Sequence, residues 1–172
     1  MGFLIQRIFL LLIVLLGLLS CENNPEKPEK KIEKKVKKWL EVGVFNQDSA
    51  YKFISKQVSY GPRVPNTSNH VKCGDWLSTK LASLGFEVTQ QVGEVTAFNG
   101  AKLPVRNIIG NFNKNSSKKI MLCAHWDTRP FADRDTLNIN LPIIGANDGA
   151  SGVGILLEIA RIIQKDSLKI GL

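Results

Sequence analysis

Three polar side chains in the C-terminal third of the sequence have types and spacing that suit a metal site. His125 could supply a neutral imidazole nitrogen, and Asp127, two residues later, could accept the other ring N–H and fix the tautomer. Asp148 follows a Gly-Ala-Asn sequence and precedes Gly149, so its carboxylate could point into a crevice. A borderline-soft ion such as zinc accepts this mixture of nitrogen and oxygen ligands.

The same residues also have an ordinary structural interpretation. A histidine and an aspartate separated by one residue are a weak signal on their own. Asp148 could be a helix-start residue whose charge is stabilised by the helix dipole. Residue types and spacing therefore leave both interpretations open.

Two apolar elements would position these side chains. Ile120 to Ala124 is a short apolar run without alternation, which predicts a strand covered on both faces. From about Ser151 to Gln164 apolar residues recur at helical spacing and predict an amphipathic helix. Its apolar face consists of Val153, Leu156, Leu157, Ala160 and Ile163. Ligands bind at the carboxyl ends of strands in open α/β sheets, so the three polar residues would lie at such a crevice.

Two helices are predicted upstream of these elements. Asp48 is expected to cap a helix that ends before Gly61, and Ser68 a second helix closed by Gly85. We expect His70, in the first turn of the second helix, to face solvent.

Strands follow the second helix. Phe86 to Val92 alternates as a half-buried strand should, and Val95 to Phe98 is a short candidate. Asn99-Gly100 predicts a turn before a strand from Val105 to Phe112. These elements predict an α/β fold with a mixed β-sheet and flanking helices.

The N-terminus predicts export. Residues 1–20 combine Arg7 with an apolar segment from Ile8 to Leu16, which is the size of a secretory signal. The segment ends Leu-Leu-Ser before Cys21 and resembles a bacterial lipoprotein box, so we expect lipidation of Cys21. The protein would then be a membrane-anchored lipoprotein of a bacterial envelope, and an uncleaved anchor is the alternative.

A charged linker separates this signal from the domain. Residues 21–43 hold seven lysines and five glutamates and are expected to remain solvated. The domain would occupy residues 44–172. The net charge of +8 is spread along the chain without an arginine cluster, which argues against a nucleic-acid surface. Cys73 and Cys123 could form a disulfide, but two buried free thiols fit their predicted elements better.

Three longer strings resemble a known family. AHWDTRPFADRD, PIIGANDGASGVGILLEIAR and, upstream, FISKQVSYGPRVPNTSNHVKCGDWLSTKL are similar to bacterial glutaminyl-peptide cyclotransferases (glutaminyl cyclases) of the zinc aminopeptidase family. The resemblance runs from about Phe45 to the end of the chain. It implies the N-terminal half of a zinc aminopeptidase-like (phosphorylase/hydrolase-like) fold.

The resemblance assigns roles to individual residues. Asp148 corresponds to a zinc ligand. His125 corresponds to a metal ligand in the two-zinc aminopeptidases and lies beside the metal in the one-zinc cyclotransferases. The resemblance implies that Asp127, Trp126 and Arg129 surround the metal ligands or line the pocket beside the metal. The alternative for the loop that carries them is a salt-bridged surface loop.

The implied activity is conversion of an N-terminal glutamine to pyroglutamate with release of ammonia. One Zn²⁺ would polarise the side-chain amide, a glutamate would move the proton, and peptide or protein N-termini bearing glutamine would be the substrates. The alternatives are a zinc aminopeptidase of the same family and a non-catalytic membrane-anchored remnant.

The resemblance also implies that part of the site lies elsewhere. In the family a glutamate ligand, a late histidine ligand and the acid/base glutamate follow the position of Leu172. We therefore expect a truncated domain that is inactive alone and exposes an apolar edge to aggregation.

Overall fold

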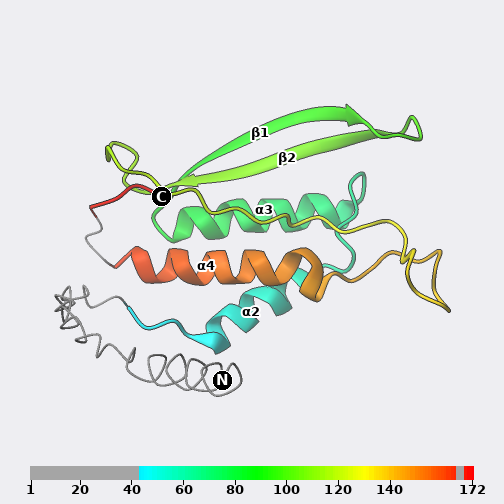
Figure 1. The fold of residues 1–172 in the computed structure, drawn as a ribbon, viewed down its shortest axis with the longest axis horizontal. Coiled ribbons are helices and arrows are strands. Elements are labelled where there is room, and N and C mark those ends of the chain that lie inside the picture. Colours follow the sequence, from blue (N-terminus) through cyan, green and yellow to red (C-terminus); the bar gives the residue numbers. More distant parts are fainter. Residues whose placement is uncertain (1–42, 166–168) are drawn as a thin grey trace, which may run out of the picture. The chain divides into compact units, whose positions relative to one another are not determined.

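The computed structural model describes residues 43–165 and 169–172. The predicted signal peptide, Cys21 and almost all of the linker lie outside these residues. The described chain forms α2 (Gln47–Val58), α3 (Ser68–Ser83), β1 (Glu87–Thr96), β2 (Lys102–Asn111), a wide helical turn (Ala146–Ala150) and α4 (Ser151–Ile163). In Figure 1, α3 lies between the hairpin of β1 and β2 and the helix α4.

The two predicted upstream helices are confirmed, with different capping residues. Asn46, rather than Asp48, caps α2, because its side-chain oxygen accepts a hydrogen bond from the Ser49 amide. Thr67, rather than Ser68, caps α3 by accepting from the His70 amide. In each case the capping residue has extended backbone, which an N-cap requires and the first helical residue lacks.

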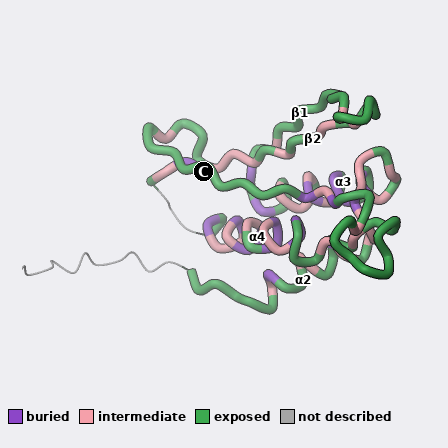
Figure 2. Tube along the Cα trace, turned by 45° about the vertical axis from the view of Figure 1, so that its right-hand side comes forward, coloured by how far each residue is buried: buried purple, intermediate pink, exposed green. Residues whose placement is uncertain are grey.

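The predicted turn at Asn99-Gly100 is confirmed, and the strands on either side of it are longer than expected. The two short candidates before the turn form the single strand β1, which pairs antiparallel with β2 so that Val92 lies opposite Arg106. β1 is mostly exposed rather than half-buried, because only one face near its start meets α3. Figure 2 shows this contrast between the mostly green strand β1 and the purple sides of α3 and α4.

The amphipathic helix predicted from Ser151 is confirmed as α4 and supplies much of the core. Val153, Leu157, Ala160 and Ile163 are buried there, together with Cys73, Leu77, Leu84, Phe86 and Trp126. α2 crosses α4 closely. A Cβ atom on Gly154 would lie 2.6 Å from Ile54 Cγ1 and 3.1 Å from the Ala50 carbonyl oxygen. A residue without a side chain is therefore needed at this crossing.

The prediction of a buried strand from Ile120 to Ala124 is wrong for the described chain. Ile120, Met121 and Leu122 are 50%, 86% and 43% exposed, and this stretch contains no strand. The parallel pairing consists of an isolated bridge between Lys119 and Gly171. An apolar sequence becomes a strand only where a neighbour bonds its backbone, and among the described residues Gly171 alone does so here. The α/β class is confirmed, with a two-stranded antiparallel sheet.

Both described cysteines are free thiols, but they differ in exposure. Cys73 is buried as predicted, and burial raises the pKa of its thiol to about 11. Cys123 was expected to be buried and is exposed, because the stretch that carries it is not covered by neighbouring strands. Neither is therefore part of a disulfide in the structure.

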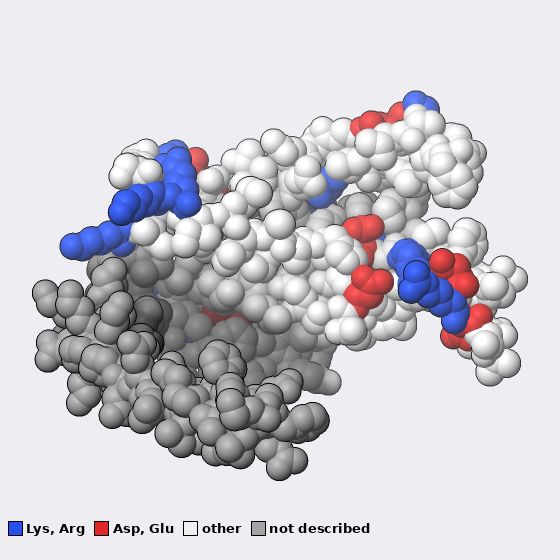
Figure 3. Space-filling view, in the orientation of Figure 1, with Lys and Arg blue, Asp and Glu red and all other residues white. Residues whose placement is uncertain are grey.

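Basic side chains of the hairpin are paired with acidic ones. Lys102 lies 3.0 Å from Glu94, and Arg106 lies 2.8 Å from Asp75. On the face shown in Figure 3, lysines and arginines form separate groups, several of them beside carboxylates.

Of the helices in the described residues, none has the length and apolar character needed to cross a bilayer.

Candidate active site

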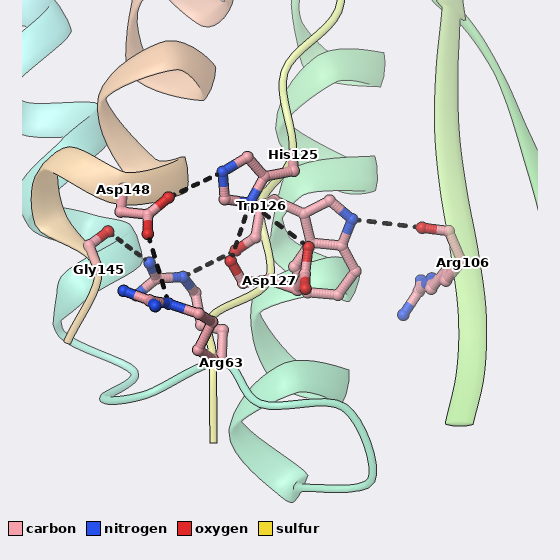
Figure 4. Close-up of polar contacts among 8 residues, drawn as sticks. Arg63, Arg106, His125, Trp126, Asp127, Gly145 and Asp148 are labelled. Atoms are coloured by element: carbon pink, nitrogen blue, oxygen red, sulfur yellow. Dashed lines mark hydrogen bonds and ion pairs between the residues drawn. The ribbon is translucent and has the colours of Figure 1, made fainter. Parts of the chain in front are cut away.

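The structure brings two of the predicted site residues into direct contact. His125 Nε2 lies 3.0 Å from Asp148 Oδ1, although 23 residues separate them in the chain (148 − 125). Both side chains are about half exposed, at 57% and 51%. Figure 4 shows the imidazole and the carboxylate facing each other from the two segments. A nitrogen and an oxygen donor therefore meet at one accessible point.

Asp127 contacts His125 differently from the prediction. His125 Nδ1 lies 3.2 Å from the main-chain oxygen of Asp127 and 3.6 Å from its carboxylate oxygen Oδ1. The nearer partner of the ring is thus the carbonyl oxygen. A carbonyl oxygen, like a carboxylate oxygen, can accept a hydrogen bond from an N–H group. This contact can therefore still select the tautomer with hydrogen on Nδ1.

The backbone at Asp148 explains why its carboxylate points toward His125. Ala146–Ala150 forms one wide turn in which Asp148 (φ −83°, ψ 99°) and Gly149 (φ 97°, ψ −59°) leave helical geometry. A residue with a side chain rarely adopts the φ of Gly149. A Cβ atom on Gly149 would also lie 3.1 Å from His125 Cε1 and 3.1 Å from the Asp127 oxygen. Gly149 is therefore required both by conformation and by space.

A fully buried arginine connects the two segments that carry the site. Arg63 Nε donates to the main-chain oxygen of Trp126 at 3.0 Å. Its Nη1 and Nη2 donate to the oxygens of Ile144 at 2.9 Å and Gly145 at 2.7 Å. Figure 4 shows the guanidinium between the two segments. Burial lowers the pKa of this group, while Cys73 and Asp127 oppose the shift. Arginine remains charged even so, and a planar fork of donors can satisfy several carbonyls at once.

Trp126 anchors the His125 segment to the hairpin. Its ring is 9% exposed, and Nε1 donates to the Arg106 oxygen at 3.2 Å. The ring stacks on His70 with centroids 4.1 Å apart. Trp126 therefore turns its indole toward β2, away from the contact between His125 and Asp148 (Figure 4).

The expectation that His70 faces solvent is wrong. His70 is 5% exposed, because the Trp126 ring covers it. Burial lowers the pKa of His70, with a weaker opposing effect of Asp127. The covering ring comes from a residue 56 positions later (126 − 70), which no pattern around the first turn of α3 indicates.

Arg129 lies near the second carboxylate oxygen of Asp148. Arg129 Nε is 3.9 Å from Asp148 Oδ2, and its guanidinium pairs with Asp133 four residues later. The loop that carries both is largely exposed, including Phe131 at 56%. The cationic group thus faces one carboxylate oxygen while His125 faces the other.

The donor chemistry of this site suits zinc, but the described residues supply too few ligands. Zinc is held by three or four protein donors. The described part of the chain contains no group of three histidine, cysteine, aspartate or glutamate residues arranged to hold a metal. Asp148 and His125 therefore fit part of a coordination sphere and do not complete one.

Arg63 and Glu158 are charged residues that the structure buries and that the sequence did not single out. The importance of Arg63 was not predicted, and its only signal in the sequence is a single arginine in a stiff loop between Pro62 and Pro65. Glu158 is fully buried, pairs with Arg161 at 2.5 Å and accepts from the Asn46 amide at 2.8 Å. These contacts hold the start of α2 against α4, so Glu158 has a structural role.

Comparisons with known proteins found similar sequences and structures. Residues 107–171 match the model of peptidase family M28, a segment that includes His125 and Asp148. A crystal structure of a glutaminyl cyclase from Bacteroides thetaiotaomicron is 52% identical with a TM-score of 0.74, over 76% of this chain and 45% of that one. A zinc-dependent exopeptidase from Parabacteroides distasonis is 50% identical with a TM-score of 0.74, over 76% of this chain and 45% of that one.

A curated relative is more distant. The glutaminyl-peptide cyclotransferase of Drosophila melanogaster is 28% identical over 109 residues, which is 60% of this chain and 27% of that protein. The chain therefore spans less than half the length of these relatives. The matched segment, the shared fold and the 52% identity lead to one conclusion. Residues 107–171 match peptidase family M28, and the chain is similar to the bacterial glutaminyl cyclases of the zinc aminopeptidase-like family.

Proposed function

We propose that this chain contributes the first part of the catalytic domain of a zinc-dependent glutaminyl-peptide cyclotransferase. The observation that carries the proposal is the contact between Asp148 and His125 at 3.0 Å, at a wide turn beside an exposed loop. The similarity to bacterial glutaminyl cyclases, at 52% identity over this region, supports the choice of reaction.

The proposed substrate is a peptide or protein whose N-terminal residue is glutamine. The α-amino nitrogen attacks the side-chain amide carbon, the bond from that carbon to the amide nitrogen breaks, and a proton passes from the amine to the departing ammonia. Five-membered ring closure gives pyroglutamate. The proton transfer calls for a general acid/base, commonly a carboxylate.

We propose that several of the described residues contribute to this machinery. Asp148 would be a zinc ligand, His125 would ligate or stand beside the metal, and Arg63 would hold the two segments together. Further ligands and the acid/base glutamate are proposed to come from residues outside this chain. The proposal therefore includes that the chain does not turn over substrate alone.

A zinc aminopeptidase is the second candidate. It is favoured by the family match and by the 50% identity to a zinc-dependent exopeptidase. The two activities differ in product, because a peptidase releases a free amino acid whereas a cyclotransferase releases ammonia and keeps the peptide intact.

The test joins residues 44–172 to the remaining part of the Bacteroides thetaiotaomicron glutaminyl cyclase. With zinc, the chimera should release ammonia from a glutaminyl peptide and form pyroglutamate, and the Asp148→Ala chimera should not. Release of free N-terminal amino acids instead would support the aminopeptidase. Turnover by this chain alone, lost in Asp148→Ala, would overturn the proposal that the site is incomplete.

A further inference from the structure

The carboxylate of Asp148 faces two groups that approach it to different distances. His125 Nε2 lies 3.0 Å from Oδ1, which is within hydrogen-bonding distance. Arg129 Nε lies 3.9 Å from Oδ2, which is too far for a hydrogen bond. Arg129 therefore places a positive charge beside Asp148 without donating to it through this atom.

The guanidinium of Arg129 is bonded to a different carboxylate. Its Nη1 donates to Asp133 Oδ1, and the two side chains are 47% and 61% exposed. An arginine carries five N–H donors in a planar fork, which matches a carboxylate through two parallel hydrogen bonds. Without Asp133, the guanidinium could turn onto Asp148, whose Oδ2 already lies 3.9 Å from Nε.

The loop that carries Arg129 also determines where the Asp133 carboxylate lies. The Asp135 amide donates to the Ala132 oxygen at 2.7 Å, which closes a tight turn with Asp133 as its second residue. The Ala132 amide donates to the Leu141 oxygen at 2.8 Å and so ties this turn to the returning side of the loop. Both bonds join residues of the same loop, so the position of Asp133 is set within it.

A guanidinium and a dication compete for the same carboxylate. Both are attracted by its negative charge, and both use the lone pairs of its oxygens. A guanidinium paired with Asp148 in the bidentate manner would occupy both oxygens, so zinc could bind only by displacing it. The position of Arg129 therefore affects the affinity of Asp148 for zinc.

We propose that Asp133 is a positioning residue of the metal site, which holds Arg129 away from Asp148 and so leaves a carboxylate oxygen accessible to zinc. This role depends on the proposed ligation of zinc by Asp148, and it is the same in a cyclotransferase and in an aminopeptidase. Asp133 acts through Arg129 and is assigned no contact with the metal or the substrate.

The test uses the full chain, produced with isotope-labelled histidine and held in detergent micelles for nuclear magnetic resonance. The sequence contains two histidines, so the spectrum has two sets of ring signals. Added Zn²⁺ should shift the His125 ring signals, and the shift gives the affinity even where two protein donors bind zinc weakly. His70, which is buried against Trp126, reports whether each variant keeps its fold.

Substitution of Asp133 should lower the affinity for zinc only while Arg129 is present. Asp133→Ala should weaken zinc binding by roughly threefold to fivefold, which is the size of interactions between exposed charged side chains. Arg129→Gln removes the competitor and should bind zinc at least as tightly as the unmodified chain. In the Arg129→Gln background, Asp133→Ala should change the affinity by less than about 1.5-fold.

Two comparisons exclude simpler causes. Loss of a negative charge near zinc would weaken binding equally with and without Arg129, so the double variant separates this effect from positioning. Asp135→Ala removes another carboxylate of the same loop, whose oxygen accepts the Leu137 and Asn138 amides at 2.8 and 3.1 Å. This variant keeps both members of the pair between Arg129 and Asp133, and it should weaken zinc binding less than Asp133→Ala.

Each of the following outcomes would overturn this role of Asp133. They are equal losses of zinc affinity from Asp133→Ala in the two backgrounds, an equal loss from Asp135→Ala, and His125 signals that do not respond to Zn²⁺ in the unmodified chain. Weaker binding by Arg129→Gln alone would show that Arg129 supports Asp148 instead of competing with zinc.

Two provisions keep the result interpretable. Asp133→Asn, which keeps the shape of the side chain, replaces Asp133→Ala if the His70 signals show loss of the fold. Failure of the proposed cyclisation is a separate outcome, because it is measured from the products of the chimera and not from zinc affinity.

Discussion

Arg63 donates a 2.7 Å hydrogen bond to the main-chain oxygen of Gly145, three residues before Asp148. The same guanidinium bonds the oxygen of Trp126, the residue after His125. One buried cation therefore sets the distance between the two segments that meet at the candidate site.

Replacement of Arg63 should destabilise the protein and separate those segments. Arg63→Met leaves at least three carbonyl oxygens without their donor, which should lower the free energy of unfolding by on the order of 3 kcal/mol. Arg63→Lys keeps the charge but not the planar fork of donors. Its free energy of unfolding should therefore lie between those of the unmodified protein and Arg63→Met. Urea unfolding measures the change. Arg134→Met, at an exposed position, is the control, and equal midpoints for it and Arg63→Met would contradict this role.

Zinc content should separate the roles of Asp148 and His125 in the completed enzyme. In the chimera with the Bacteroides thetaiotaomicron enzyme, Asp148→Ala should abolish both bound zinc and cyclisation, because it removes a charged ligand. His125→Ala should reduce activity while retaining more zinc, if the site holds one metal. Metal analysis of the purified variants provides the measurement. Complete loss of metal in both would indicate the two-metal arrangement of a peptidase.

Gly149 should be intolerant of a side chain for two separable reasons. Gly149→Ala adds a strained φ of +97° and contacts of 3.1 Å with His125 and Asp127. Gly85→Ala is the matched control, since its φ is +83° but nothing lies within 4 Å of an added Cβ. We expect Gly85→Ala to cost about 1 kcal/mol of stability and Gly149→Ala clearly more. Thermal unfolding compares them, and equal costs would show that the site accommodates the methyl group.

Stability should depend on Glu158 at acidic pH. The hydrogen bonds from Arg161 lower the pKa of this carboxyl to about 2, from an ordinary value of 4.5. A lowered pKa in the folded state means that the carboxylate stabilises the fold fully above pH 4.5 and that this contribution disappears as the pH falls toward about 2. In urea unfolding, the free energy of unfolding should decline less for Glu158→Gln than for the unmodified protein as the pH falls between these values. Parallel declines for both proteins would argue against a paired carboxylate.

Substitution of Cys21 would test the proposed export and membrane anchoring. The apolar segment that ends at Leu-Leu-Ser-Cys predicts acylation of the Cys21 thiol after cleavage. Cys21→Ser should lose incorporation of labelled fatty acid and leave the membrane fraction of a bacterial host, whereas Cys73→Ser should change neither. If Cys21→Ser remains in the membrane fraction, an uncleaved anchor explains the segment better.

The sequence determined the elements whose pattern is local. The spacing of apolar residues from Val153 to Ile163 is sufficient to define α4, because the 3.6-residue period places them on one face whatever they contact. The turn at Asn99-Gly100 likewise depends on the conformational freedom of two adjacent residues. Asp148 and His125 could be singled out because their residue types and neighbours restrict the chemistry available to them.

Only the tertiary structure decided the features that depend on a distant partner. Ile120 to Ala124 has the composition of a buried strand, yet a strand exists only where another backbone supplies its hydrogen bonds, and among the described residues only Gly171 bonds this stretch. His70 is covered by Trp126, and Arg63 bonds carbonyls 63 to 82 residues away. Such contacts require the chain to be folded before the groups meet, so no spacing within the sequence reveals them.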